Sequence, residues 1–334
     1  MIFDPPIMAL LLAASLSMVV IAAGALFAIR VLRHWDHSSG HARQIVMEKQ
    51  THLVSTALRV VLVMQMLALI LFVHNADRMA VLFTGAMCAL GTINVNDYGM
   101  PAFLLQVAVF FGAGAWLVVN MADSAGRDYP YTRLKYALLL LLAPLAIAAG
   151  VLEWLYFLSL DPNVITSCCS QLFAPEGAGV QADLSAIDPK IALYALFGSL
   201  APLLALGLWA TRSGDRGAAS VFGLAGVAFF PLAVAAIISV VSPYIYEAPT
   251  HHCPFCIMKP QYGFIGYVLY LPLFSASAMS LGLAILSLWP LPESMKNTLP
   301  LIIRRLGGLS TILFAAFGVA VIYAIMTSHL ILLS

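Results

Sequence analysis

Apolar residues make up most of this chain and gather into eight long runs separated by shorter polar stretches. Each run approaches or exceeds the roughly 20 residues that a helix needs to cross a hydrocarbon core of about 30 Å. The runs lack the alternation of polar and apolar residues that marks the strands of a membrane barrel, so the pattern predicts helices. The predicted spans are residues 7–32, 53–74, 99–122, 136–160, 191–211, 219–243, 261–289 and 308–332.

A further apolar stretch lies between the second and third runs. It covers about a dozen residues around 80 to 92, too few to cross the membrane, and it ends in the polar, turn-rich GTINVNDYG. This pattern predicts an interfacial or re-entrant helix. The predicted fold class is therefore all-α, a polytopic integral membrane protein with about eight transmembrane helices plus this one interfacial or re-entrant helix.

The spacing of the runs also bears on domain organisation. We expect a single membrane domain over residues 1–334, with a possible arrangement of four plus four helices. The halves would be 1–160 and 190–334, joined by a cysteine-containing outer loop at 161–189. Small residues, such as the AIAAG that ends at Gly150, predict close helix packing.

Composition and charge support this class and exclude another. The chain is 62% hydrophobic and only 9% charged, far from the composition of a soluble domain. Its net charge is +1 and it has no basic tract, so no nucleic-acid partner is expected. The lipid bilayer is the expected surrounding.

The distribution of Lys and Arg predicts the orientation. Most of these cations lie at or after the odd-numbered spans, which places the loops that follow those spans in the cytoplasm. Both termini and all five cysteines would then lie on the outer side of the cytoplasmic (inner) membrane, where disulfides form and persist. The cations on the predicted inner side are Arg30, Arg33, Arg43, Lys49, Arg127, Arg133, Lys135, Arg212, Arg216, Lys296, Arg304 and Arg305.

The segment HHCPFC, residues 251–256, carries the densest chemistry in the chain. Cys253 and Cys256 form a Cys-x-x-Cys pair, which can close a small disulfide ring or bind one metal ion. His251 and His252 can lower the pKa of the thiols or act as ligands themselves. Cysteine with histidine is the usual ligand set of zinc and Cu(I) sites, so the predicted metal ligands are these four residues and Cys88.

Two more cysteines lie in the loop after the fourth span. Cys168 and Cys169 are adjacent, and a disulfide between neighbours is strained and easily reduced. We expect these thiols to pair with another segment, to bind a metal or to exchange disulfides. Because five is an odd number, at least one cysteine is left without a disulfide.

In layout, the Cys-x-x-Cys at Cys253 and Cys256 together with the loop cysteines Cys168 and Cys169 resembles two families. They are the disulfide-generating membrane proteins of bacteria and the vitamin K epoxide reductase group. The likeness covers only these two short segments, since those families have four-helix cores and this chain has eight predicted spans. The resemblance implies quinone as a possible cofactor. The expected quinone pocket would lie near Glu153, Trp154 and Arg78.

Three functions are consistent with these features. In the first, the protein is a membrane thiol–disulfide oxidoreductase or electron relay: Cys253 and Cys256 form the redox pair, and Cys168 and Cys169 pass electrons to or from a periplasmic thiol or electron-transfer protein. In the second, it handles copper or zinc as a transporter or assembly factor. In the third, it is a non-catalytic membrane subunit of a larger respiratory-type complex, and its cysteines staple outer loops together.

Overall fold

The computed structural model shows an all-α polytopic membrane protein. It describes residues 3–35, 42–126, 128–166 and 180–330; the side chains of 42–43 and 180–182 are not described. The described residues contain no β-strand. Eight helices are long and apolar enough to span a membrane, which confirms the predicted fold class.

The long helices match the predicted spans in number and order. They are α1 (Pro5–His34), α2 (Ala42–Met79), α4 (Gly99–Ala125), α5 (Thr132–Leu158), α8 (Pro189–Ser213), α9 (Arg216–Ala236), α11 (Ile265–Leu288) and α12 (Leu299–Thr327). Shorter elements are η1 (Ala80–Leu82), α3 (Ala89–Ile93), α7 (Val180–Ser185), the π-helical η2 (Ile237–Val241), α10 (Ser242–Tyr246), η3 (Cys256–Met258), η4 (Pro260–Tyr262) and η5 (Glu293–Met295).

Several helix boundaries differ from the prediction. α2 begins at Ala42, eleven residues before the predicted start at 53. Its first turns are polar, so a prediction from apolar runs does not include them, yet they are helical. α12 begins at Leu299 rather than at 308. The helix expected around 80 to 92 is present as two short pieces, η1 and α3, separated by a turn at Gly85.

The link between α8 and α9 shows how sequence sets helix ends. α8 starts with Pro189, whose side chain fixes a helical φ, and the carboxylate of Asp188 accepts hydrogen bonds from the first free backbone N–H groups. Gly214 ends α8 in the left-handed region at φ 68°. Asp215 then caps α9 by accepting a 2.8 Å bond from the N–H of Ala218. These residues allow a short, tight turn between α8 and α9.

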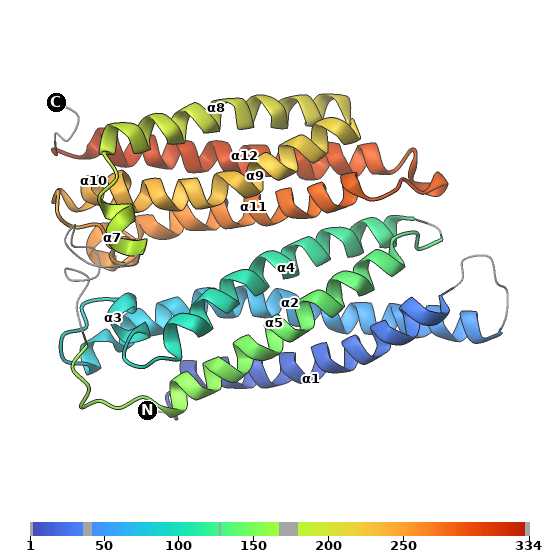
Figure 1. Ribbon diagram of the computed structural model, residues 1–334, viewed down its shortest axis with the longest axis horizontal. Helices are drawn as coiled ribbons and strands as arrows, with labels where there is room; N and C mark the ends of the chain where they lie inside the picture. The colour runs from blue at the N-terminus through green and yellow to red at the C-terminus, as the bar shows by residue number, and fades with distance from the viewer. Residues whose placement is uncertain (1–2, 36–41, 127, 167–179, 331–334) are drawn as a thin grey trace. The chain divides into compact units, whose positions relative to one another are not determined.

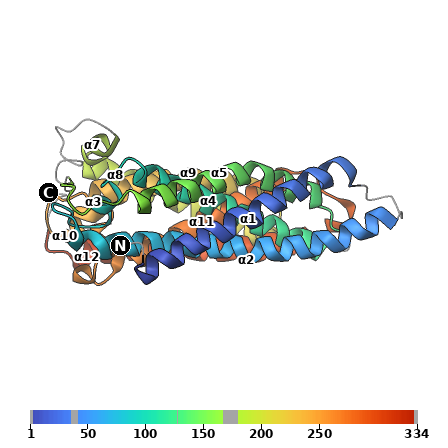
Figure 2. The same ribbon diagram turned by 90° about the horizontal axis from the view of Figure 1, so that it is seen from below.

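The chain divides into two compact units. The first contains residues 1–75, 96–160 and 285–302, and thus α1, most of α2, α4 and α5. These helices run alongside one another, with α5 against both α1 and α4 (Figures 1 and 2). Trp116 and Tyr136 are fully buried in the core of this unit. At Gly150 a Cβ would lie 2.8 Å from the Met18 sulfur, so the small residue allows α5 to approach α1 closely.

The second unit contains residues 76–95, 161–284 and 303–334. α8, α9 and most of α11 and α12 run side by side within it (Figure 1). Phe314 makes edge-to-face contacts with Phe222 and Phe229. A Cβ at Gly223 would lie 2.7 Å from the carbonyl oxygen of Ser280, as expected for a close helix crossing. Segment 76–95 belongs to this unit although it precedes α4, so the boundary is not confined to the loop at 161–189. The proposed repeat of two halves stays a prediction.

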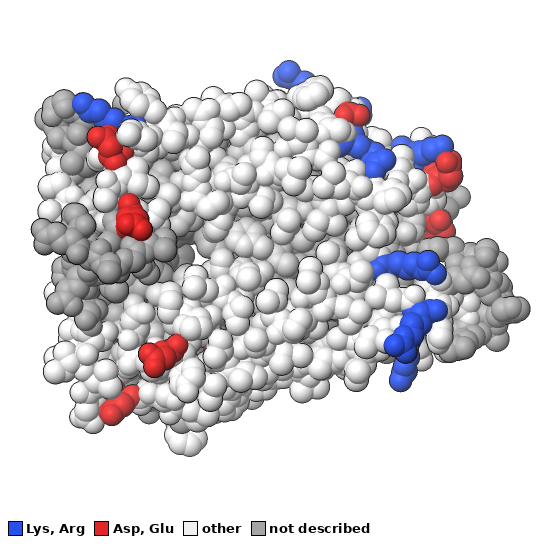
Figure 3. All heavy atoms as spheres, viewed as in Figure 1, with Lys and Arg blue, Asp and Glu red and all other residues white. Residues whose placement is uncertain are grey.

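Most charged side chains lie toward helix ends, whereas Arg59 of α2 and Glu153 of α5 lie inside their helices. On the face drawn in Figure 3, the Lys, Arg, Asp and Glu atoms lie over the ends of the helices, and the middle of each unit shows none. The outward side of α1 illustrates the apolar middle, since Leu12, Leu16 and Val19 are exposed. Exposing such an apolar surface to water costs free energy, whereas contact with lipid does not. The protein is therefore integral to a membrane.

A buried ion pair joins the facing ends of α4 and α5. Lys135 Nζ lies 2.5 Å from Asp123 Oδ2, and both side chains are almost completely buried. Asp123 also accepts bonds from the backbone N–H of Tyr131 and the hydroxyl of Thr132, and Lys135 donates to Asn120. Because every partner is a polar group fixed on one of the two helices or on their connection, the pair holds that connection in one conformation.

Asp123→Asn tests this pair. The substitution leaves the ammonium group of Lys135 buried without a counter-ion, so we expect the free energy of unfolding to fall by about 3–5 kcal/mol. The matched control is Glu293→Gln, because its ion pair with Lys296 is exposed and should be worth less than about 1 kcal/mol. Reversible unfolding in mixed micelles measures both. Equal effects of the two substitutions would contradict a stabilising role for the buried pair.

Candidate metal centre

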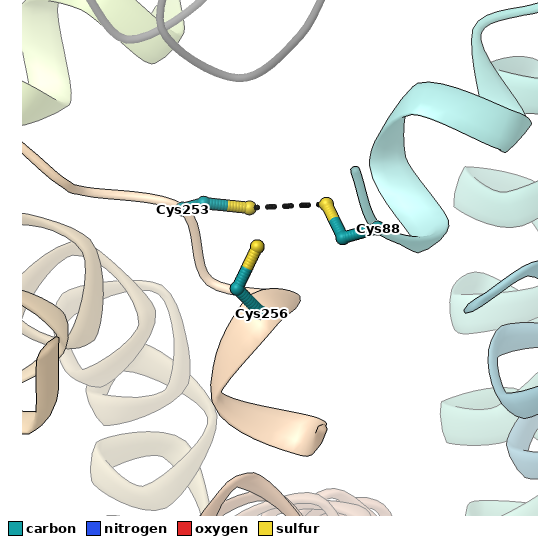
Figure 4. Close-up of side chains that lie close together, drawn as sticks. All are labelled: Cys88, Cys253 and Cys256. Atoms are coloured by element: carbon teal, nitrogen blue, oxygen red, sulfur yellow. Dashed lines mark hydrogen bonds between the residues drawn. The ribbon is translucent and has the colours of Figure 1, made fainter. Parts of the chain in front are cut away.

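Three cysteines from distant parts of the sequence converge in the second unit. Cys88 precedes α3, and Cys253 and Cys256 lie between α10 and α11. The three Sγ atoms all lie within 4.8 Å of one another, and those of Cys88 and Cys253 are 3.6 Å apart. Figure 4 shows the three side chains pointing toward a common centre. The exposed fractions of these residues are 0%, 0% and 5% in sequence order.

The Cys-x-x-Cys motif forms a turn that brings its two thiols together. Pro254 and Phe255 occupy the turn, and Cys256 begins the 3-10 helix η3. Met258 donates its backbone N–H to the carbonyl of Phe255 at 3.1 Å, which closes the first turn of this helix. Proline fixes one backbone angle in advance, so the sequence itself favours the turn. The result is a rigid pair of neighbouring sulfur atoms.

Two tyrosines anchor this turn to the helices on either side. The hydroxyl of Tyr246, the last residue of α10, donates to the carbonyl of Cys253 at 2.5 Å. The hydroxyl of Tyr270, in α11, donates to the carbonyl of Pro254 at 2.9 Å. Each bond satisfies a backbone oxygen next to the thiols, so the turn is fixed by its main chain and the sulfur atoms stay available.

A lysine joins the turn to the segment that carries Cys88. Lys259 donates from its ammonium group to the carbonyl of Met87, which directly precedes Cys88. The same ammonium lies 3.8 Å from a carboxylate oxygen of Asp77. Lys259 therefore links the two halves of the centre and places a positive charge one residue away from a thiol.

Thr166 supports the Cys88 segment from a third part of the chain. Its backbone N–H donates to the carbonyl of Thr84 at 3.0 Å, and its hydroxyl donates to the carbonyl of Gly91 at 2.9 Å. Gly85 is required beside it, because its φ is +90° and a Cβ there would lie 2.2 Å from the Thr166 carbonyl oxygen. Three chain segments thus fix the position of Cys88.

The two histidines are near the thiols in sequence but take part in other contacts. The ring of His251 stacks on Tyr246, with 4.0 Å between ring centroids. His252 is buried, and its Nδ1 lies 3.0 Å from the carbonyl oxygen of Ile238 in the π-helical η2. Neither imidazole belongs to the group of ligand atoms that lie within 4.8 Å of one another among the described residues.

None of the other predicted site residues that the structure describes belongs to the cysteine cluster. Cys168 and Cys169 are outside the described residues. Glu153 and Trp154 belong to the first unit, and Arg78 to the second. Glu153 accepts a hydrogen bond from Gln106 at 3.0 Å, and Trp154 donates its ring N–H to Ser15 at 3.0 Å. The predicted quinone pocket near Glu153, Trp154 and Arg78 stays a prediction.

Sequence reasoning missed Tyr246, Tyr270 and Lys259. No spacing rule points to them, because a tyrosine or a lysine near a membrane surface is common and each acts here through a main-chain oxygen. Gln106 was also missed, although a glutamine inside an apolar span is a detectable signal.

Comparison of the chain with models of protein families, with curated proteins and with solved structures found no match.

The geometry defines what this centre can do chemically. Three buried thiols within van der Waals or ligand distance offer soft donors to one ion, and as thiolates they attack disulfides. Burial keeps large reagents away. A small ion or a small molecule can reach the sulfur atoms more easily than a folded protein can.

Tyr246→Phe tests how the turn is held. The substitution removes one hydrogen bond of about 1 kcal/mol, so local opening of the turn and the rate of Cys253 alkylation should rise about fivefold. The measurement is mass spectrometry of the metal-free protein after timed treatment with a small thiol reagent. Tyr194→Phe is the matched control, because that side chain, in the second turn of α8, is 76% exposed. An unchanged alkylation rate in Tyr246→Phe would show that the bond does not restrain Cys253.

Proposed function

We propose that the protein binds one Cu(I) ion at Cys88, Cys253 and Cys256 and that it handles copper at a membrane. The observation that carries this proposal is the convergence of three buried cysteine sulfur atoms on one point. Thiolates are soft ligands that select soft ions over Mg²⁺ or Ca²⁺.

The number and spacing of the thiols favour Cu(I) over zinc. Structural zinc sites are almost always four-coordinate, whereas only three ligand atoms converge among the described residues. An ion at the centre of three sulfurs, with bonds of about 2.3 Å, leaves neighbouring sulfurs about 4 Å apart. The distance of 3.6 Å between Cys88 and Cys253, with all three sulfurs inside 4.8 Å, brackets this value. Little movement is needed to close the site on an ion.

An ion held by three buried thiolates would also need compensation for its charge. Three thiolates and one Cu(I) carry a net charge of −2, which is costly in a buried place. The ammonium of Lys259 lies on the backbone of the residue before Cys88 and offsets part of this charge. Binding requires the thiols to lose their protons, so affinity should increase as the pH rises.

The sidedness predicted from Lys and Arg is part of this proposal. With both termini and all cysteines on the outer side of the cytoplasmic membrane, the centre would receive copper from, or deliver copper to, a periplasmic protein or another membrane subunit. A transporter or an assembly factor for a metalloprotein fits this position.

A second candidate, thiol–disulfide exchange, is favoured by one specific observation. Cys88 Sγ lies 3.6 Å from Cys253 Sγ, so a third thiol stands beside a Cys-x-x-Cys pair. Oxidation of Cys253 and Cys256 would form one S–S bond and release two electrons and two protons, which a quinone would accept to become a quinol. Cys168 and Cys169 would relay electrons to an outer partner in this candidate.

The copper proposal predicts a specific pattern of metal binding. Protein purified without oxygen should bind one Cu(I) per chain, and Cys88→Ser, Cys253→Ser and Cys256→Ser should each lower the affinity at least about 100-fold. Loss of an outer-shell group alone costs 10- to 100-fold, so loss of a ligand should cost no less. Competition with a coloured Cu(I) chelator measures the affinity.

The double substitution Cys168→Ser, Cys169→Ser is the matched control, because it removes two thiols that the proposed site does not use. It should keep stoichiometric Cu(I). The proposal is wrong if only this double variant loses copper, or if the protein binds Zn²⁺ stoichiometrically and has no measurable affinity for Cu(I).

The exchange candidate makes a different prediction. Reduced, metal-free protein mixed with a short-chain quinone should form a disulfide between Cys253 and Cys256 and one equivalent of quinol, and Cys256→Ser should abolish both products. Mass spectrometry identifies the disulfide, and absorbance follows the quinol. Unreacted quinone in the presence of the reduced wild-type protein would reject this candidate.

A further inference from the structure

A buried carboxylate and a buried amide face each other inside the first unit. Glu153 of α5 is 2% exposed and Gln106 of α4 is 7% exposed. Gln106 donates its Nε2–H to Glu153 Oε2 at 3.0 Å. Both residues lie within helices long and apolar enough to span the membrane. Neither residue belongs to the cysteine centre, and both lie in the other unit.

Each member of the pair retains one unsatisfied oxygen. Glu153 Oε1 and Gln106 Oε1 are both buried, and neither has a hydrogen-bond partner among the described residues. Both atoms act as acceptors when the carboxyl group is ionised, so neither can satisfy the other. Buried acceptors without donors each cost about 1–3 kcal/mol, more for a charged group. Two orphaned acceptors in one hydrogen-bonded pair indicate that a donor is missing.

We propose that Glu153 and Gln106 form a proton-binding site, in which the proton sits on Glu153 Oε1 and is donated to Gln106 Oε1. The carboxylic acid and the amide then share two hydrogen bonds in a closed ring. Uptake of a single proton converts the carboxylate to the acid, satisfies both orphaned oxygens and removes a buried negative charge. Release of the proton reverses each of these changes.

Among the described residues, Gln106 is the hydrogen-bond partner of Glu153, and the ion pairs of this unit join other residues. The charge of an ionised Glu153 would have no counter-ion among them. The remaining titratable groups on neighbouring elements toward this end of the unit are Asp4 before α1, His74 on α2, Asp97 and Tyr98 before α4, and Tyr156 on α5. Hard cations such as Ca²⁺ take six or more oxygen ligands, and the pair offers two.

The position along the helices indicates how the proton is exchanged. Glu153 lies five residues before the end of α5 at Leu158, which corresponds to about 8 Å of helix. Gln106 lies seven residues after the start of α4 at Gly99, or about 10 Å. The opposite ends of both helices are much farther away. Proton exchange therefore takes place from the end where α5 terminates and α4 begins.

Infrared spectroscopy of the full chain in lipid tests the site. At neutral pH the wild type should show the carbonyl band of a protonated carboxylic acid, and the band should be absent in Glu153→Gln. In Gln106→Leu the band should shift in frequency, because the acid loses its amide partner. Asp161→Asn is the matched control outside the spans and should leave the band unchanged.

Stability measurements give an independent outcome. Glu153→Gln should keep the thermal midpoint close to that of the wild type, because its amide N–H replaces the acid O–H as donor to Gln106. A wild-type spectrum without the acid band at neutral pH would overturn the proposal. So would a thermal midpoint that rises with Na⁺ in the wild type and not in Glu153→Gln, since the site would then bind a metal cation in place of the proton. If Glu153→Gln does not fold, the band shift in Gln106→Leu decides alone.

Discussion

The proximity of three sulfur atoms that are not bonded to one another is the constraint on which the candidate site depends. Cys88 and Cys253 are 165 residues apart in the chain, yet their Sγ atoms are 3.6 Å apart and both residues are fully buried. Weak S–H donors and acceptors gain little from such contacts. What the arrangement offers instead is a set of soft donors, fixed by hydrogen bonds to main-chain oxygens rather than by bonds to sulfur. An ion bound as proposed would leave these main-chain hydrogen bonds intact.

The fold could be predicted largely from the sequence because lipid imposes strict rules. A backbone in hydrocarbon must satisfy its own hydrogen bonds, so long apolar runs become helices, and all eight were found where the runs predicted them. The boundaries were less predictable. The first turns of α2 contain Gln44, Glu48 and Lys49, which hydropathy assigns to a loop although they have good helix propensity. Sequence patterns also gave no reason to group segment 76–95 with the second unit, because that grouping depends on contacts distant in the chain.

The cysteines that converge could be singled out from the sequence, and the side chains that hold their segments in place could not. Residue chemistry identified Cys88, Cys253 and Cys256, since thiols in an apolar protein are conspicuous. The neighbouring imidazoles were expected beside them, and the structure places them in a ring stack on Tyr246 and on the carbonyl of Ile238. That carbonyl lies in a π-helical turn, an irregularity that has no reliable sequence signature. Which side chains reach which main-chain oxygens depends on the three-dimensional path of the loops.

The two units carry different chemistry at similar depth of burial. The second holds soft sulfur donors, which suit a soft ion or electron transfer, and the first holds an acid–amide pair, which suits a proton. The central claim is that the thiols of Cys88 and Cys253 lie together in the folded protein, and its most direct test requires no metal binding. In a chain whose only cysteines are Cys88 and Cys253, mild oxidation should rapidly form an intrachain disulfide in nearly every molecule, detected by peptide mass spectrometry. If the two thiols stayed reduced under conditions that oxidise free cysteine, the three-cysteine centre would not exist in the folded protein.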